Sequence, residues 1–192
     1  MAFTDYETQQ IREALLEQAR KCAFTLGMRK TSVEQLTQAV GISKGSFYKF
    51  FESKELLFFT ALENVHTELY EVADKSLSEN AFLSPAERAS KAVLAVCKRL
   101  SDTGAMSFME NDAEAILRRL PEKIKVEHYH DDETHICQLL EKHGLEPKDG
   151  MELAAATVRG LFLTVSHQME IGDRYPEVLR ILICGAMTEL FK

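Results

Sequence analysis

The chain has 192 residues, of which 45% are hydrophobic, so it can bury the core of one compact domain or of a small domain joined to a larger one. No window offers the apolar run of about 18 residues that a membrane span requires, and no signal peptide is indicated. We therefore expect a cytoplasmic protein without a membrane partner. The net charge of −7 argues against a surface coated with positive charge.

The charge is unevenly distributed along the chain. Residues 20–54 hold seven Lys and Arg against two Asp and Glu, whereas residues 1–19 and 55–192 are both acidic. A short basic segment on an acidic body is typical of a polyanion-binding head, although a solvated charged face would show the same distribution.

Two helices are predicted before residue 41. Apolar residues recur at steps of three and four from Ile11 to Leu26 and predict a first helix, which Gly27 ends. Thr31 and Glu34 have the spacing of a capping box, which predicts the start of a second helix of about two turns.

A turn and two more helix starts follow. Gly41 is expected to end the second helix and to reverse the chain, because glycine adopts backbone conformations that other residues avoid. Ser43 is a good N-cap for a third short helix, whose inner side Phe47 buries. Ser53 can cap a fourth helix that begins near Lys54.

The rest of the chain also predicts helices and no strands. We expect an all-α fold of about nine helices, with a three-helix head over residues 1–53 and a larger helical body over residues 54–192. The predicted body helices cover residues 54–77, 85–102, 105–120 and 121–143, followed by two apolar helices divided near Gly172 and Pro176.

The outer side of the third predicted helix carries groups suited to phosphates and base edges. Lys44 and Lys49 can neutralise phosphates, the hydroxyls of Ser46 and Tyr48 can donate hydrogen bonds, and the missing side chain at Gly45 permits close approach. The head therefore predicts a helix-turn-helix that binds double-stranded DNA. A helical packing unit with a solvated basic face is the alternative.

One motif favours a catalytic interpretation. Residues 41–45 match the Gly-x-Ser-x-Gly pattern of hydrolase nucleophile elbows. That elbow must follow a buried strand, whereas residues 33–40 predict a helix. The sequence also lacks the common zinc-protease, dinucleotide-binding and phosphate-cradling motifs. We therefore expect no enzyme and no cofactor.

Residues 8–58 resemble the DNA-binding head of the tetracycline-repressor (TetR) family. The resemblance covers about a quarter of the chain and includes GISKGSFY at 41–48 and FESKELL at 51–57. It implies phosphate contacts near the start of the second helix and a third helix in the major groove. The implied DNA-binding residues are Thr31, Ser32, Lys44, Gly45, Ser46, Tyr48, Lys49 and Lys54.

The segment departs from the usual family pattern at Leu36 and Thr37, where a β-branched aliphatic residue and alanine are typical. Because a threonine hydroxyl can bond back to its own helix, we expect slightly altered packing and intact function.

The resemblance also implies a homodimer built from the last two helices. Their apolar residues exceed what one core-facing stripe needs, although two core helices of a monomer would show the same excess. A two-fold dimer predicts a palindromic operator. The residues expected at the interface are Val158, Leu161, Val165, Val178, Leu182 and Ala186.

The resemblance also implies a small-molecule effector. This molecule would bind in the body and shift the fourth helix, which would release the DNA. Flexible and aromatic side chains could line an apolar pocket, although residues at such spacing mostly fill the core. The candidate pocket residues are Met106, Phe108, Met109, Ile116 and Phe162.

Two other modes of sensing stay open. Glu127, Asp131 and His135 share one helix face and could present metal ligands, but such faces are usually solvated, and no metal site is predicted. Cys22 lies beside Lys21 and is the one candidate redox thiol, although its place on an apolar face favours packing.

The sequence thus predicts a ligand-responsive transcriptional regulator, a repressor, that binds a palindromic operator as a homodimer. The alternatives are a metal- or redox-responsive regulator of the same fold and a helical adaptor without DNA binding, which would need no basic segment at residues 20–54.

Overall fold

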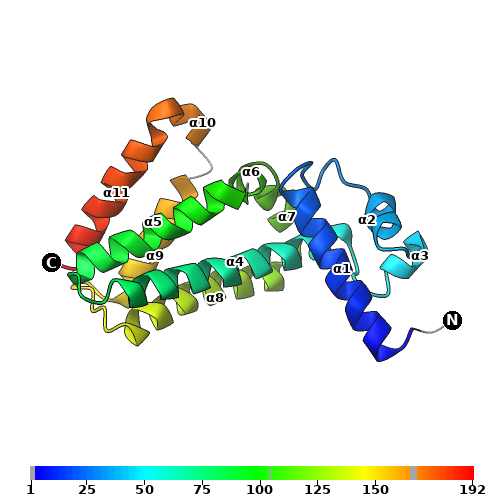
Figure 1. Ribbon diagram of the computed structural model, residues 1–192, viewed down its shortest axis with the longest axis horizontal. Helices are drawn as coiled ribbons and strands as arrows, with labels where there is room; N and C mark the ends of the chain where they lie inside the picture. Colours follow the sequence, from blue (N-terminus) through cyan, green and yellow to red (C-terminus); the bar gives the residue numbers. More distant parts are fainter. Residues whose placement is uncertain (1–2, 104, 165–167) are drawn as a thin grey trace. The chain divides into compact units, whose positions relative to one another are not determined.

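The computed structural model describes the main chain of residues 3–103, 105–164 and 168–192, with all their side chains except those at 106, 107, 109, 110, 128–130 and 169. Every regular element in these ranges is a helix (Figure 1), so the all-α prediction is confirmed. No helix among them is long and apolar enough to cross a membrane.

The chain forms two compact units. Unit 1 comprises Met1–His66 and Ser107–Pro121, and unit 2 comprises Thr67–Met106 and Glu122–Lys192. The sequence placed a domain boundary at residue 54, where α4 begins, whereas the contacts divide the chain within α4 and assign a later segment to unit 1.

Unit 1 contains the N-terminal helices and a short helical segment from the middle of the chain. Its interior is formed by buried apolar side chains that include Leu15, Leu36, Phe47, Phe58 and Ile116. The helices are α1 (Asp5–Ala23), α2 (Val33–Ala39), α3 (Lys44–Phe47), the first half of α4 (Lys54–Glu79), the end of α6 (Ala105–Phe108), the π-helical η1 (Met109–Ala113) and α7 (Glu114–Leu117).

The first helix differs from its prediction at both ends. It starts earlier, because Thr4 and Glu7 form a capping box, and it ends at Ala23. The main-chain N–H groups of Leu26 and Gly27 both donate to the Cys22 carbonyl at 2.9 Å, which turns the chain out of the helix. Leu26, predicted on the apolar face, is 52% exposed.

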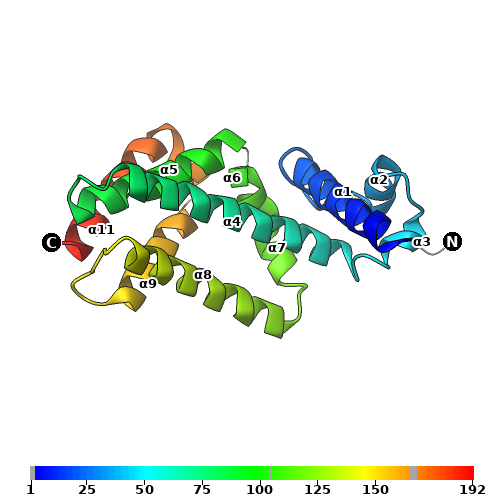
Figure 2. The ribbon, with the colours of Figure 1, turned by 60° about the horizontal axis from the view of Figure 1, so that its bottom comes forward.

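Unit 2 contains the remaining helices, with α11 packed on α5 and α9, and α8 packed on α9 (Figure 2). Its core includes Leu77, Val93, Leu140, Ile183 and Met187. The helices are the second half of α4, α5 (Pro85–Thr103), α8 (Glu122–Lys142), α9 (Met151–Leu163), α10 (Gln168–Ile171), η3 (Gly172–Arg174) and α11 (Tyr175–Leu190).

The acidic and histidine-rich cluster of α8 contacts neighbouring helices. Tyr70 of α4 donates to Asp132 at 2.8 Å and stacks on the His135 ring with centroids 4.9 Å apart. Arg159 of α9 pairs with Glu133 at 3.5 Å. Three side chains of the cluster therefore join α8 to α4 and α9. The side chains of His128 and His130 lie outside the described residues.

The described members of the predicted apolar pocket are core residues or pack against the core. Phe108 is buried in unit 1, with its ring centre 6.3 Å from that of Phe58, and Ile116 is fully buried there. Phe162 packs against the core of unit 2. The side chains of Met106 and Met109 lie outside the described residues. Core packing accounts for the three described side chains.

Candidate nucleic-acid interface

The start of α2 is fixed by a capping box one residue later than predicted. The Ser32 hydroxyl accepts from the Gln35 N–H at 3.1 Å, and the Gln35 side chain accepts from the Ser32 N–H at 2.7 Å. Thr31 is buried, with its hydroxyl donating to the Gly27 carbonyl and its N–H to the Met28 carbonyl. Both Thr31 donors are therefore used within the protein, whereas Ser32 is exposed and suited to a phosphate.

The turn after α2 depends on Gly41, as the sequence predicted. Gly41 has φ of +74°, and a Cβ there would meet no described atom within 4 Å, so backbone conformation and not crowding requires the glycine. The Ile42 N–H then donates to the Thr37 carbonyl at 3.0 Å, which starts the reversal of the chain toward α3.

The third helix begins where the sequence placed it. Ser43 is the N-cap and accepts from the Ser46 N–H at 3.1 Å, while Phe47 is completely buried on the inner side. The regular α-helix covers only Lys44–Phe47, and a turn continues through Phe50.

A residue that sequence reasoning missed, Arg12 of α1, fixes the end of this turn. Its guanidinium donates to the Phe50 carbonyl at 3.0 Å and lies 4.5 Å from the centre of the Phe51 ring. These contacts join α1 to the chain directly after α3.

The predicted outer side of α3 faces solvent. Lys44, Gly45, Tyr48 and Lys49 are exposed, and Ser46 is half-buried with its hydroxyl 2.9 Å from that of Ser43. The surface therefore presents two ammonium groups, a phenol 55% exposed and a glycine without a side chain. These groups suit contact with a sugar-phosphate backbone and base edges.

The two lysines have different partners. The Lys44 ammonium forms an ion pair with Glu34 of α2, and this contact raises the pKa of Lys44 and lowers the pKa of Glu34. The Lys49 ammonium lies 5.8 Å from the centre of the Phe3 ring, a cation–π distance.

Lys54, at the start of α4, is directed at the main chain. Its ammonium donates to the carbonyls of Met28 at 2.9 Å and Thr31 at 2.8 Å. The side chain thus holds the connection between α1 and α2, directly before the exposed Ser32.

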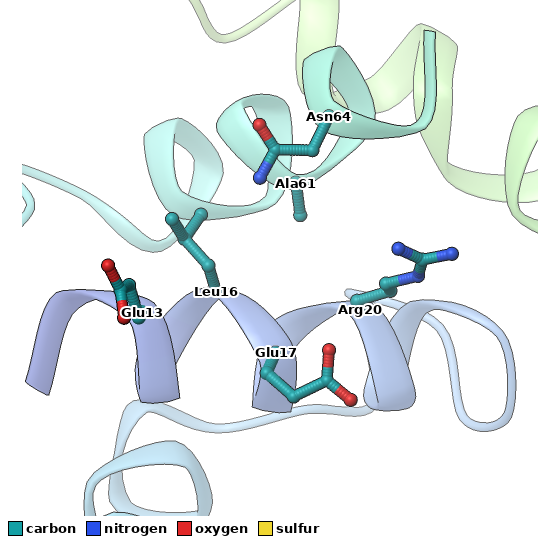
Figure 3. Close-up of a pocket in the computed structure, with 6 residues that line it drawn as sticks. All are labelled: Glu13, Leu16, Glu17, Arg20, Ala61 and Asn64. Carbon is teal, nitrogen blue, oxygen red and sulfur yellow. The ribbon is translucent and has the colours of Figure 1, made fainter. Parts of the chain in front are cut away.

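An open groove lies elsewhere in unit 1, between α1 and α4 (Figure 3). Leu16 extends from α1 toward α4, where Ala61 faces the groove. The lining contains charged and amide groups. None of the lining residues is a Ser, Cys or Thr nucleophile with a neighbouring general base, the arrangement that nucleophilic catalysis uses. The groove is lined by Glu13, Leu16, Glu17, Arg20, Ala61 and Asn64.

A capped short helix, a glycine in the left-handed region and a second short helix with outward cations define a helix-turn-helix of the DNA-binding class. The family model for bacterial regulatory proteins of the tetR family matches residues 15–61, which include all three features. Over these residues the chain is similar to the DNA-binding segment of the tetR family.

A curated relative is similar to part of the chain. An HTH-type transcriptional repressor of Mycobacterium tuberculosis is 40% identical over 57 residues, which make up 30% of this chain and 30% of the relative. The match therefore spans less than a third of the relative's length.

Solved structures show the same fold over nearly the whole chain. A protein of Mesorhizobium loti described as a TetR-family transcriptional regulator has a TM-score of 0.70 at 16% identity and covers 98% of this chain and 97% of its own. FadR of Bacillus subtilis, in complex with stearoyl-CoA, has a TM-score of 0.62 at 14% identity and covers 94% and 97%.

Proposed function

We propose that this protein represses transcription by binding a palindromic operator as a homodimer, and that a small molecule bound in unit 2 releases the DNA. The observation that carries the proposal is the exposed outer side of α3, where Lys44, Tyr48 and Lys49 stand beyond a buried Phe47. The N-terminus of α2, with its exposed Ser32, offers a phosphate contact beside it.

Two apolar helix faces support the homodimer. Leu163 of α9 is 71% exposed, and Ile181 and Leu182 of α11 are 62% and 42% exposed. An added Cβ at Gly160 or Gly185 would meet no described atom within 4 Å. Glycine within a helix costs about 1 kcal/mol relative to alanine, so two uncrowded helical glycines fit close approach by a second copy.

The structure changes which residues we propose for the interface. Leu161 is buried in the core of unit 2, and Val158 and Ala186 pack against that core. Val165 lies outside the described residues, and Val178 is half-buried. Exposure therefore favours Leu182, from the predicted set, together with three residues that the set lacked: Leu153, Leu163 and Ile181.

A small-molecule effector is favoured over redox sensing. Cys22 and Cys97 are buried, and burial raises the pKa of the Cys97 thiol to about 12, which suppresses its reactive thiolate. FadR, a protein of the same fold, is in complex with stearoyl-CoA, which supports a small-molecule effector. Metal sensing would need Glu127, Asp131 and His135 of α8. Glu127 pairs with Lys123 on its own helix, and the His135 ring stacks on Tyr70 of α4.

The test is selection of bound sequences from a random duplex library by the purified chain, followed by titration of the selected duplex over a range of salt concentrations. We expect a palindromic sequence, two chains per duplex and affinity that falls steeply with salt. No enrichment at any salt concentration would contradict the proposal and favour the helical adaptor. A non-palindromic site bound by one chain would contradict the homodimer.

A further inference from the structure

Asp112 is an acidic residue of η1 whose side chain reaches the connection between α1 and α2. The residue is 3% exposed, and its Oδ2 accepts from the main-chain N–H of Met28 at 2.8 Å. Arg29 places its Nε 3.9 Å from Oδ1 of the same carboxylate. A carboxylate 84 residues away in sequence is thus the partner of one main-chain N–H in this connection.

The connection is built to admit this carboxylate. A Cβ on Gly27 would lie 2.5 Å from Asp112 Oδ2, which is closer than real Cβ contacts come. The contact is therefore specific to this turn and to this position of Asp112.

The turn is held from two sides. The Met28 peptide donates its N–H to Asp112 and accepts at its carbonyl from Lys54, which also holds the Thr31 carbonyl. Ser32 follows directly as the N-cap of α2. A displacement of either anchor changes where the N-terminus of α2 lies.

The segment around Asp112 has an unusual helical form. Met109–Ala113 is a π-helical turn between α6 and α7. Such turns are rare in proteins overall, but those that occur are often found at functional sites. The segment belongs to unit 1, yet the chain enters it from α5 and leaves it toward α8, both helices of unit 2.

From these observations we infer that Asp112 is a positioning residue for DNA binding: its carboxylate holds the Met28 N–H and so sets the N-terminus of α2, and it connects the segment between α5 and α8 to the DNA-binding head. The inference rests on the proposed function. Besides α4, it gives a second route from the body to the head, which passes through the hydrogen bond between Asp112 and Met28.

Variants of the full chain separate this role from general stability. Asp112→Ala removes the acceptor, whereas Asp112→Asn keeps its shape and one acceptor oxygen without the charge. Glu114→Gln is the matched control, because Glu114 lies two residues away, is exposed and pairs with Arg118 on its own helix. The measurements are thermal unfolding, hydrogen exchange at the Met28 amide and affinity for the duplex selected by the wild-type chain.

In the Asp112→Ala chain, we expect the Met28 amide hydrogen to exchange with solvent faster than in wild type. We also expect the variant to bind the duplex on the order of tenfold more weakly, which matches the loss of a hydrogen bond to a charged group. The salt slope should stay unchanged, because Asp112 contacts no phosphate. Asp112→Asn should lie between Asp112→Ala and wild type, and Glu114→Gln should match wild type.

Wild-type affinity of a folded Asp112→Ala chain would overturn the inference, as would a loss of affinity without faster exchange at Met28. If Asp112→Ala does not fold, Asp112→Asn decides: wild-type exchange and affinity in that variant overturn the inference. A wild-type chain that selects no duplex is a different result, since it contradicts the proposed function itself.

Discussion

The Lys44 ammonium of α3 is paired with the Glu34 carboxylate of α2, ten residues earlier in the chain. Both side chains are more than half exposed, so the pair stands on the surface proposed to meet DNA. A phosphate that contacts this surface must therefore compete with Glu34 for the Lys44 ammonium of α3. This competition predicts the effect of removing the carboxylate.

Glu34→Gln should bind duplex DNA a few-fold more tightly and with a steeper dependence on salt, by up to about one unit of slope, because Lys44 becomes free to neutralise a phosphate. Fluorescence anisotropy over a range of salt concentrations measures both quantities. Glu17→Gln is the control, since Glu17 pairs with Lys21 on α1 and the charge change is the same. Equal effects of the two substitutions would show that only net charge matters.

Local features of the head were predictable from sequence because neighbouring residues determine them. The left-handed turn at Gly41, the cap at Ser43 and the buried Phe47 each depend on contacts within a few positions. Thr37 likewise bonds back to its own helix as expected, with its hydroxyl donating to the carbonyls of Val33 and Glu34.

The start of α2 shows where local patterns become ambiguous. Thr31 with Glu34 and Ser32 with Gln35 both have the spacing of a capping box. The tertiary structure decides between them, because Thr31 is buried against the Gly27 carbonyl and only Ser32 can cap. The spacing of residues in the sequence contains no information on whether Thr31 is buried.

Contacts between distant residues could not be predicted at all. Arg12 meets Phe50 over 38 positions, and Asp112 meets Met28 over 84. No spacing pattern in the sequence predicts contacts over such separations, because the tertiary fold and not the helix repeat brings these residues together. The sequence also did not separate the exposed apolar positions of α9 and α11 from the buried ones, because two faces of a helix rich in Leu and Ile look alike in sequence.

Lys54→Met should lower the free energy of unfolding by about 1–3 kcal/mol, since two charge-assisted hydrogen bonds to main-chain carbonyls are lost. Urea denaturation measures the change. Lys75→Met is the control on the same helix, where the exposed Lys75 pairs with Glu79 and its loss should cost less than about 1 kcal/mol.

The same Lys54→Met chain should bind DNA more weakly at every sequence, because the turn before Ser32 loosens. The family resemblance also assigns Lys54 a phosphate, which would reduce the salt slope by about 0.9. A weaker affinity with an unchanged slope would restrict Lys54 to holding the turn, and an unchanged affinity would contradict both roles.

Ile181→Glu should dissociate the homodimer, because burial of a carboxylate at an apolar interface is strongly unfavourable. We expect the dimer to weaken at least roughly tenfold and operator affinity to fall with it. Sedimentation velocity at several concentrations measures the dimer. Phe82→Glu, at an 83% exposed position between α4 and α5, is the control and should leave the dimer intact. A dimeric Ile181→Glu chain would place the interface elsewhere.

Cys97 should make the protein less stable as the pH rises above about 9. Burial raises the pKa of its thiol from 9.0 to about 12 in the folded chain. Between these values the unfolded chain loses the proton that the folded chain keeps, so stability falls with rising pH, by up to about 4 kcal/mol in all. Below pH 9 both states are protonated and the contribution is constant.

Cys97→Ala isolates this effect, because other groups that titrate at high pH are shared with the wild-type chain. The wild-type stability, measured by urea denaturation at intervals from pH 8 to about pH 11, should fall faster than that of the variant. Iodoacetamide at pH 8 should alkylate Cys97 about a thousandfold more slowly than an ordinary thiol, as its smaller thiolate fraction requires. Parallel stability curves together with rapid alkylation would show that Cys97 is accessible and that burial does not control its titration.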